Sequence, residues 1–386
     1  MVKLWSFFTI FAAFMVAGAV TIRAGLGRRD QWILGDWLID YSAGFNRRGL
    51  LGEAIRQLEI LLGVDRVLVT TLVQLSVLAA LGVCLLVLVS FHRRGMNTVL
   101  LVASPAFVLF FLNPLGTMRK EILLWLLVAA VLVWSRPGGK TGRKLAPWAL
   151  VTTFPLLVLI HEGLVFYAGF LVIVLWLLVT EGTVSRRNAY LAGGVGTFLT
   201  ALAAGASLLF PGRSGVGESI CATLVATGYD DALCNGAIGF LDQSAAFSLS
   251  RVVESVTEGN YLGVYLPVIA LSSVPFLFVR WSKPLASLLV LSLAMTLPLF
   301  VVAIDWGRWI VISVWLISMI VLRFDYSPHI SLTIATKRTA ALFGVATPVG
   351  AIVFATLWSI PHCCEPRIGF GLIDRFADAL VILGLN

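Results

Sequence analysis

Charged residues are scarce in this sequence of 386 residues. Asp, Glu, Lys and Arg make up only 12% of it, whereas hydrophobic residues make up 59%. Soluble domains carry about 25% charged residues, so the composition excludes an ordinary soluble protein. Long apolar runs recur along the chain, and each approaches or exceeds the roughly 20 residues that a membrane helix needs. The sequence therefore predicts an all-α, polytopic transmembrane helical bundle.

Several motifs with known chemistry are also missing. The chain has no Walker A loop, no Cys-x-x-Cys metal pattern and no Gly-x-Ser-x-Gly elbow. No single predicted helix carries a run of charged residues either. We therefore expect neither ATP-driven transport nor voltage sensing. We also expect no cofactor, no dedicated metal site and no nucleic-acid partner, and a divalent metal ion stays open as an alternative.

We expect about eleven membrane helices within one integral membrane domain that covers residues 1–386. Their predicted ranges are 4–25, 67–91, 97–113, 119–135, 146–161, 163–180, 188–210, 260–280, 284–304, 308–323 and 339–359. The domain divides into a helical core over 1–210, which includes an outer loop and surface helix within 26–66, then a long outer loop over 211–259, and last the C-terminal helices and outer tail over 260–386.

Charge asymmetry predicts the orientation of these helices. If the sides alternate from the N-terminus, one face receives half of the 28 Lys and Arg residues but only two of the 20 carboxylates, Glu181 and Asp325. Short basic loops face the cytoplasm. We therefore expect a multi-pass protein of the inner (plasma) membrane, in contact with membrane lipids. Its N-terminus would be cytoplasmic, and its C-terminus and active site would face the periplasm or exterior.

The cysteines agree with this orientation. Cys84 falls within a predicted helix, whereas Cys221, Cys234, Cys363 and Cys364 fall on the predicted outer face, where the compartment is oxidising. We expect a Cys221–Cys234 disulfide or links between that loop and the C-terminal pair. Free buried thiols are the alternative.

The densest polar cluster follows the first predicted helix. It contains Asp36, Asp40, Tyr41, Arg47 and Arg48. Two carboxylates four residues apart can share one face of a helix. Arginine suits phosphate, because its planar fork donates two parallel charge-assisted hydrogen bonds. Residues 50–64 then predict an amphipathic helix on the membrane surface.

Three further clusters lie on the same predicted face. They are Arg119 and Lys120 in the segment 113–121, His161 with Glu162, and Asp305, Trp306 and Arg308. The apolar runs on either side of Arg119 and Lys120 are short, which predicts that these charges are recessed into the membrane and face a polar cavity. Plainer roles stay open: interfacial snorkelling for Arg119 and Lys120, helix capping for His161, and an Asp–Arg lock between helix ends.

This order of features resembles the GT-C superfamily of membrane glycosyltransferases. A basic N-terminus, a first helix, and then an outer loop with a carboxylate and a surface helix are shared, and the resemblance covers residues 1–210 best. It implies a GT-C-like fold, a polyprenyl-phosphate-linked sugar donor, and a catalytic acid in the first outer loop. That acid maps to Asp40 or Asp36, and Asp40 is preferred.

The resemblance implies an inverting sugar transfer to a hydroxyl of a glycan, lipid or protein acceptor during synthesis of a cell-envelope glycan or glycoconjugate. Arg47, Arg48, Arg119, Lys120 and Arg308 would bind the donor phosphate. The sugar and acceptor pocket would include His161, Glu162, Asp305, Tyr41 and Trp306. A Wzy-like polysaccharide polymerase or an O-antigen-type ligase is an alternative with similar chemistry. A flippase or transporter of lipid-linked sugar is a second.

Overall fold

The computed structural model describes residues 2–28, 30–91, 96–113, 118–136, 140–210, 214–325, 327–332 and 348–361, and beyond these only residues 368, 369, 371, 374, 377, 380 and 381. Cys363 and Cys364 therefore lie outside the described residues, as does the first part of the predicted helix 339–359. The described part of that helix is α15, Pro348–Thr356.

The described elements are almost entirely helical. Up to residue 209 they are α1 (Val2–Gly27), η1 (Gly35–Leu38), α2 (Leu50–Leu62), α3 (Arg66–Phe91), α4 (Met96–Val102), η2 (Val108–Leu112), α5 (Ile122–Trp134), α6 (Lys140–Ile160), η3 (Glu162–Tyr167), α7 (Ala168–Thr180) and α8 (Arg186–Leu209). They continue with α9 (Val216–Ala226), η4 (Asp231–Cys234), η5 (Gly239–Asp242), α10 (Ala245–Thr257), α11 (Tyr261–Ser273), η6 (Val274–Phe278), β1 (Val279–Trp281), α12 (Lys283–Val302), α13 (Trp306–Phe324), β2 (Ile330–Leu332) and α15.

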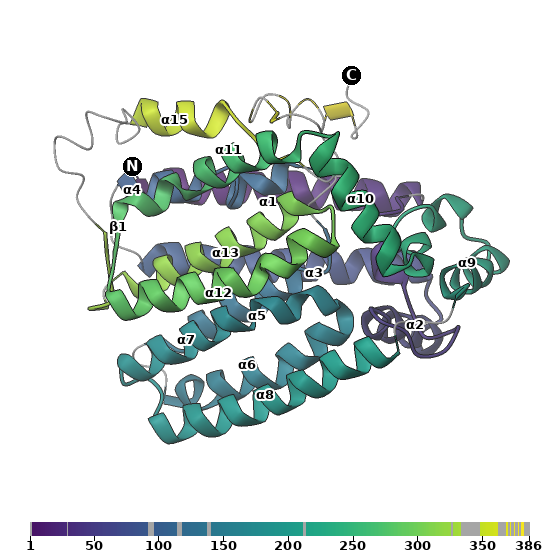
Figure 1. Cartoon of the computed structure of the whole chain (residues 1–386), viewed down its shortest axis with the longest axis horizontal. Coiled ribbons are helices and arrows are strands. Elements are labelled where there is room, and N and C mark those ends of the chain that lie inside the picture. The colour runs from purple at the N-terminus through teal and green to yellow at the C-terminus, as the bar shows by residue number, and fades with distance from the viewer. Residues whose placement is uncertain are drawn as a thin grey trace.

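Within the described residues, seven helical segments are long and apolar enough to cross a membrane. They are Leu4–Gly27, Arg66–Phe91, Glu162–Thr180, Arg186–Leu209, Tyr261–Phe278, Lys283–Val302 and Trp306–Phe324. The predicted helices 119–135 and 146–161 correspond to the shorter apolar segments Ile122–Trp134 and Lys144–Ile160. The long helices run side by side along the long axis of the molecule (Figure 1). This arrangement is that of a helical membrane protein.

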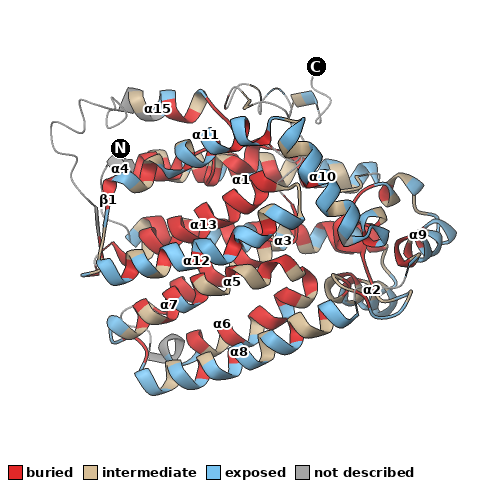
Figure 2. Ribbon diagram, in the orientation of Figure 1, coloured by how far each residue is buried: buried red, intermediate tan, exposed pale blue. Residues whose placement is uncertain are grey.

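Helix α13 forms the centre of the bundle. It packs against α3, α5, α7, α11 and α12, and nearly its whole length is buried (Figure 2). Apolar side chains on every face of a helix predict burial on every face. Its Trp315 stacks on Trp125 of α5, with ring centroids 4.5 Å apart, and also contacts Phe107 and Phe111.

The structure corrects the prediction of one continuous helix over 97–113. Helix α4 ends at Val102, and a separate 3-10 helix, η2, begins at Val108. Pro105 has no backbone N–H to donate within a helix and disfavours helical geometry in Ser104. The Ser104 hydroxyl instead accepts a hydrogen bond from the Ala106 N–H at 3.3 Å. The apolar composition had concealed this break.

The two ends of the bundle differ. At one end lie α2, α9 and α10, and at the other lies β1 (Figure 1), which pairs antiparallel with β2. Helix α2 confirms the helix predicted over 50–64. Its Ile55 is buried, whereas Leu58, Leu61 and Leu62 are exposed. That α2 lies on the membrane surface stays a prediction.

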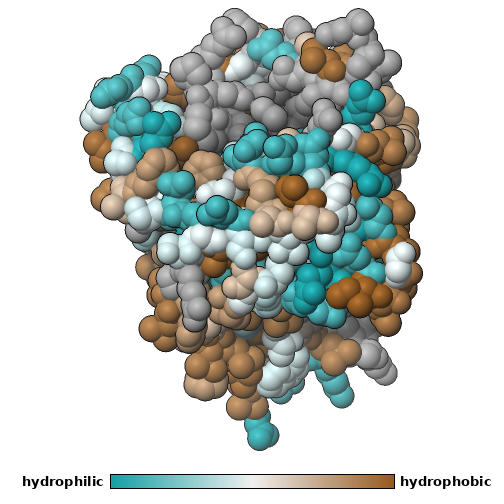
Figure 3. Space-filling model, turned by 90° about the vertical axis from the view of Figure 1, so that its right-hand side faces the viewer, coloured by the Kyte–Doolittle hydropathy of each residue, from teal (hydrophilic) through white to brown (hydrophobic). Residues whose placement is uncertain are grey.

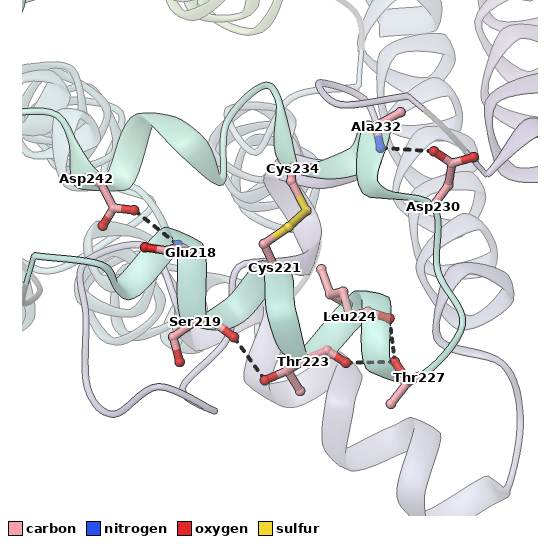
Figure 4. Close-up of a disulfide and its surroundings, with 10 residues drawn as sticks. All are labelled: Glu218, Ser219, Cys221, Thr223, Leu224, Thr227, Asp230, Ala232, Cys234 and Asp242. Atoms are coloured by element: carbon pink, nitrogen blue, oxygen red, sulfur yellow. Dashed lines mark hydrogen bonds between the residues drawn. A yellow bond between two sulfur atoms is a disulfide. The ribbon is translucent and has the colours of Figure 1, made fainter.

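A disulfide stabilises the segment that follows α8. We call residues 216–242 the disulfide cap, because Cys221 of α9 is bonded to Cys234 of η4 (Figure 4). This confirms one of the two predicted pairings. Asp242 accepts hydrogen bonds from the first N–H groups of α9, including that of Glu218 at 3.1 Å, so it serves as a helix cap.

The disulfide cap packs on the segment that links α1 to α2. Leu34, Leu38 and Ile39 share a small apolar core with residues of the cap, including Ile220 and Leu233. A Cβ atom on Gly35 would lie 2.7 Å from the Leu233 carbonyl oxygen, so only glycine permits this approach. The cap therefore restrains the loop that carries Asp36.

Candidate functional site

The structure brings the four predicted polar clusters together at the end of the bundle that carries α2, α9 and α10. We call the assembled side chains the ion-pair cluster. It contains five cations and four carboxylates, with one histidine, and its members are Asp36, Arg47, Arg48, Arg119, Lys120, Glu121, His161, Glu162, Asp305 and Arg308. Figure 3 views this end and shows hydrophilic side chains across its middle, with apolar side chains around them.

Asp36 pairs with the cations that precede α5. Its Oδ2 accepts a hydrogen bond from Arg119 Nε at 3.1 Å, and its Oδ1 lies 4.0 Å from Lys120 Nζ. All three side chains are buried. Next to Asp36, Trp37 donates its indole N–H to the Met118 carbonyl at 2.6 Å. The segment after α1 is thus fixed directly to the segment before α5.

Glu162, at the start of η3, pairs with both arginines of the first cluster. Its carboxylate accepts hydrogen bonds from Arg48 Nε at 2.8 and 3.0 Å and from Arg48 Nη2 at 2.7 Å. Arg47 Nη1 lies 3.8 Å from the same carboxylate. Lys120 donates to the Arg48 carbonyl at 2.8 Å. Arg47 and Arg48 therefore both face Glu162, and Lys120 is bonded to the backbone of Arg48.

Arg308 brings the central helix into the cluster. It is ion-paired with Glu121 and donates to Asp305 at 2.7 Å. His161 Nδ1 accepts a hydrogen bond from the Gly163 N–H, and its Nε2 lies 3.4 Å from Glu121 Oε1. A neutral His161 therefore carries its proton on Nε2, directed at Glu121.

Burial and neighbouring charges shift the pKa values of the titratable groups in the cluster in different directions. Burial opposes ionisation of Asp36, but Arg119 and Lys120 overcome it and hold the pKa of Asp36 well below its usual range. Burial raises the pKa of Asp305 despite the nearby Arg119 and Arg48. Burial also lowers the pKa of Lys120 to about 8. Asp36 is consequently ionised at neutral pH, and Lys120 titrates in mildly alkaline solution.

Asp40 lies in a neighbouring network rather than with the arginines of the first cluster. Its Oδ2 accepts from Arg66 at 2.9 Å, and its Oδ1 accepts from the hydroxyl and N–H of Ser42 at 2.6 and 2.9 Å. Arg66 also binds Glu59 at 2.6 Å. Asp36 and Asp40 do not share a helix face, because η1 ends at Leu38.

The two predicted aromatic residues have other partners. Tyr41 stacks on Phe45, with ring centroids 5.1 Å apart, and burial together with Glu53 raises the pKa of Tyr41 to about 12. Trp306 packs among Tyr261, Tyr265 and Phe300. The ring of Trp306 is therefore part of an aromatic core, and its predicted role in stacking on a sugar stays a prediction.

Arg66 and Glu121 are the polar side chains that reasoning from the sequence left without a role. Arg66 lies just outside the predicted helix 67–91, and it is buried and pairs with two carboxylates. Glu121 directly follows Lys120 and is also buried. A charge at the border of an apolar run was the available signal for both.

An apolar cavity of about 300 Å³ lies between α6, η3, α7 and α8. Aliphatic and aromatic side chains line most of it, with two threonines, Thr197 and Thr200. Val165, only three residues after Glu162, contributes to its wall. The short helix η3 thus contributes to both the ion-pair cluster and this cavity.

The arrangement suits an anion better than a metal ion. Among the residues that the structure describes, no group of three His, Cys, Asp or Glu side chains could hold a metal ion. The cluster instead offers buried arginines, which bind phosphate and carboxylate through paired N–H groups. Comparisons with protein-family models, curated proteins and solved structures find no match. The fold and its apolar helices define the class, a helical membrane protein.

Proposed function

We propose that this protein transfers a sugar from a polyprenyl-phosphate-linked donor to an acceptor hydroxyl at the membrane surface. The observation that carries the proposal is the ion-pair cluster, where five cations meet four carboxylates within a buried site at one end of an apolar bundle. A phosphate would find there the fixed cations that stabilise a leaving phosphate as its charge develops.

The apolar cavity supports a donor with a lipid tail. Two of the segments that line it, Glu162–Thr180 and Arg186–Leu209, are long and apolar enough to span a membrane, and it adjoins η3, which also supplies Glu162 to the cluster. A ligand with a phosphate at one end and a hydrocarbon chain at the other fits this neighbourhood of cationic and apolar surface. A free sugar phosphate would use only the cationic part.

We assign the role of general base to Asp36 rather than to Asp40. Asp36 lies among the phosphate-binding candidates, and within the described structure its Oδ1 accepts no hydrogen bond. Both oxygens of Asp40 already accept hydrogen bonds from Arg66 or Ser42. In the proposed step the acceptor oxygen attacks the anomeric carbon, its proton moves to Asp36, and the bond to the phosphate oxygen breaks. The polyprenyl phosphate leaves with the electron pair.

The test uses membranes that contain the full chain and a polyprenyl-phosphate sugar, either hexose or pentose, labelled in the sugar. With no ion gradient, we expect loss of the labelled lipid and release of polyprenyl phosphate. Arg119→Gln should lower the rate by about a hundredfold, the usual cost of removing one electrostatic contact to a transition state.

Arg323→Gln is the matched control, because Arg323 pairs with Glu181 in a helix-end contact outside the ion-pair cluster. It should leave the rate unchanged. Movement of intact labelled lipid across the membrane without cleavage would refute the proposal in favour of a flippase.

A further inference from the structure

We infer that the Glu162 carboxylate occupies the position that a ligand's phosphate takes, so that phosphate binding displaces Glu162 from Arg48. The inference rests on the proposed function for its ligand class, a phosphate carried on a lipid chain. It adds an intramolecular competitor to that function. Glu162 would then set which anions can enter the cluster.

The contact between Arg48 and Glu162 has the geometry that arginine uses for phosphate. Arg48 donates from Nε and Nη2 to the two carboxylate oxygens, at 2.8 and 2.7 Å. Such paired N–H···O bonds are shared by carboxylate and phosphate ligands. A phosphate that kept these two bonds would need the same space, so the two anions exclude each other.

The protein holds Arg48 in place independently of Glu162. Arg48 has a backbone φ of 71°, in the left-handed region that costs about 1 kcal/mol or more for a residue with a side chain. The fully buried Lys120 side chain donates a hydrogen bond to the Arg48 carbonyl at 2.8 Å. The arginine therefore has its own support, which would remain if Glu162 withdrew.

A second cation, Arg47, faces the same position and has a hydrogen-bond donor available. Arg47 Nη1 lies 3.8 Å from Glu162 Oε1, beyond hydrogen-bond distance. Within the described structure, Arg47 Nε is buried and donates no hydrogen bond. A phosphate has more oxygens than a carboxylate and could engage Arg47 as well as Arg48. The position is thus better matched to the larger anion.

Glu162 is also placed to withdraw. It begins a 3-10 helix of six residues, and 26% of its side chain is exposed, unlike the fully buried Asp36. The next residue is Gly163, which has no side chain. Within the described residues, the ion pairs of the Glu162 carboxylate are made only with Arg47 and Arg48. A rotation of the side chain suffices to free both arginines.

If a ligand has to displace Glu162 from Arg48, the site should select ligands by their charge. A singly charged carboxylate gains nothing over Glu162, because it replaces one carboxylate with another. The polyprenyl phosphate released by the proposed transfer is a phosphate monoester, which carries a charge between about −1.5 and −2 at neutral pH and offers three oxygens. It can therefore compensate for the loss of the Glu162 contact. The sugar-linked donor is a phosphodiester with a single charge, so displacement favours the released lipid phosphate. A lipid phosphate should therefore bind and a fatty acid of the same chain length should not.

The experiment measures binding of farnesyl phosphate, inorganic phosphate and a fatty acid to the full chain in detergent. We expect Glu162→Gln to bind farnesyl phosphate about tenfold tighter than the wild type, since a competing charged contact of that strength is removed. Glu162→Asp keeps the charge but shortens its reach, and should give an intermediate affinity. Arg48→Gln should abolish binding in either background.

Glu181→Gln is the matched control. Glu181 contacts Arg323 at 3.0 and 3.3 Å, outside the ion-pair cluster, so its loss should leave farnesyl phosphate affinity unchanged. Thermal unfolding of each variant establishes that it is folded before binding is compared.

Each outcome has a distinct meaning. Equal or weaker binding of farnesyl phosphate by folded Glu162→Gln would overturn displacement while leaving the proposed donor site standing. Absence of binding in both the wild type and Glu162→Gln would overturn the donor site and the inference together. Equal affinity for inorganic and farnesyl phosphate would assign the position to free phosphate and overturn the lipid-linked ligand.

Discussion

Reduction of the Cys221–Cys234 disulfide is expected to loosen the loop that carries Asp36. The bridge closes a segment of 13 residues in sequence separation within the disulfide cap. The cap in turn packs on residues 34–39 through a shared apolar core, and the Ala237 N–H donates to the Gln31 carbonyl at 3.4 Å. Loss of the bridge should therefore reach Asp36 through the cap.

The size of the effect follows from the length of the closed loop. Chain entropy assigns about 3 kcal/mol to a loop of this length. If the cap opens as a unit, that free energy enters its opening equilibrium in full. A factor of ten corresponds to about 1.4 kcal/mol, so the open fraction should rise roughly a hundredfold.

Hydrogen exchange followed by mass spectrometry measures this directly. In Cys221→Ser, peptides from the cap and from residues 30–41 should exchange roughly a hundredfold faster than in the wild type, with α13 unaffected. Cys84→Ser removes the free thiol of α3 and serves as the control. Faster exchange in the cap with no change over residues 30–41 would show that the cap does not restrain the loop.

Two further predictions concern buried charges. Burial lowers the pKa of Lys120 to about 8, so the cluster should lose a positive charge as pH rises through that value. The affinity for farnesyl phosphate should then fall several-fold between pH 7 and 9. A Lys120→Gln variant that kept this pH step would contradict the assignment. Asp36→Asn should lower stability by about 3–5 kcal/mol, because it leaves the buried charge of Arg119 without its carboxylate partner. Asp40→Asn should lower stability less, because Arg66 keeps its ion pair with Glu59. Thermal unfolding compares the two variants. An equal loss of stability would contradict this difference.

Most of the helical framework could be predicted from the sequence, because a membrane helix needs only a long apolar run, which composition reveals. The predicted ranges 67–91 and 188–210 agree with α3 and α8 to within a few residues. The break between α4 and η2 was missed, since Ser104 and Pro105 lie within a run whose hydropathy hardly changes. Backbone hydrogen bonding, which decides such a break, leaves little trace in composition.

Most members of the candidate site could be predicted, but their pairing could not. Scarce charges in an apolar chain stand out, so Asp36, Arg119 and Glu162 were all identified. Their partners are 83 residues away for Asp36–Arg119 and 114 for Arg48–Glu162. Such contacts depend on how helices pack, which no local pattern records. The different partners of Asp36 and Asp40, which are Arg119 and Arg66, depend on such contacts as well.

The buried position of α13 has a consequence for biosynthesis. Glu121 is synthesised 187 residues before Arg308, its partner on α13. At about 5–20 residues per second, the ribosome needs about 10–40 s to reach Arg308 after it has synthesised Glu121. For that interval the earlier helices surround an incomplete interior, and Glu121 has to be hydrated or shielded by the insertion machinery. Assembly of the site is therefore among the last events in the maturation of this protein, and a chain truncated before α13 would retain many of its helices but lack the centre around which they pack.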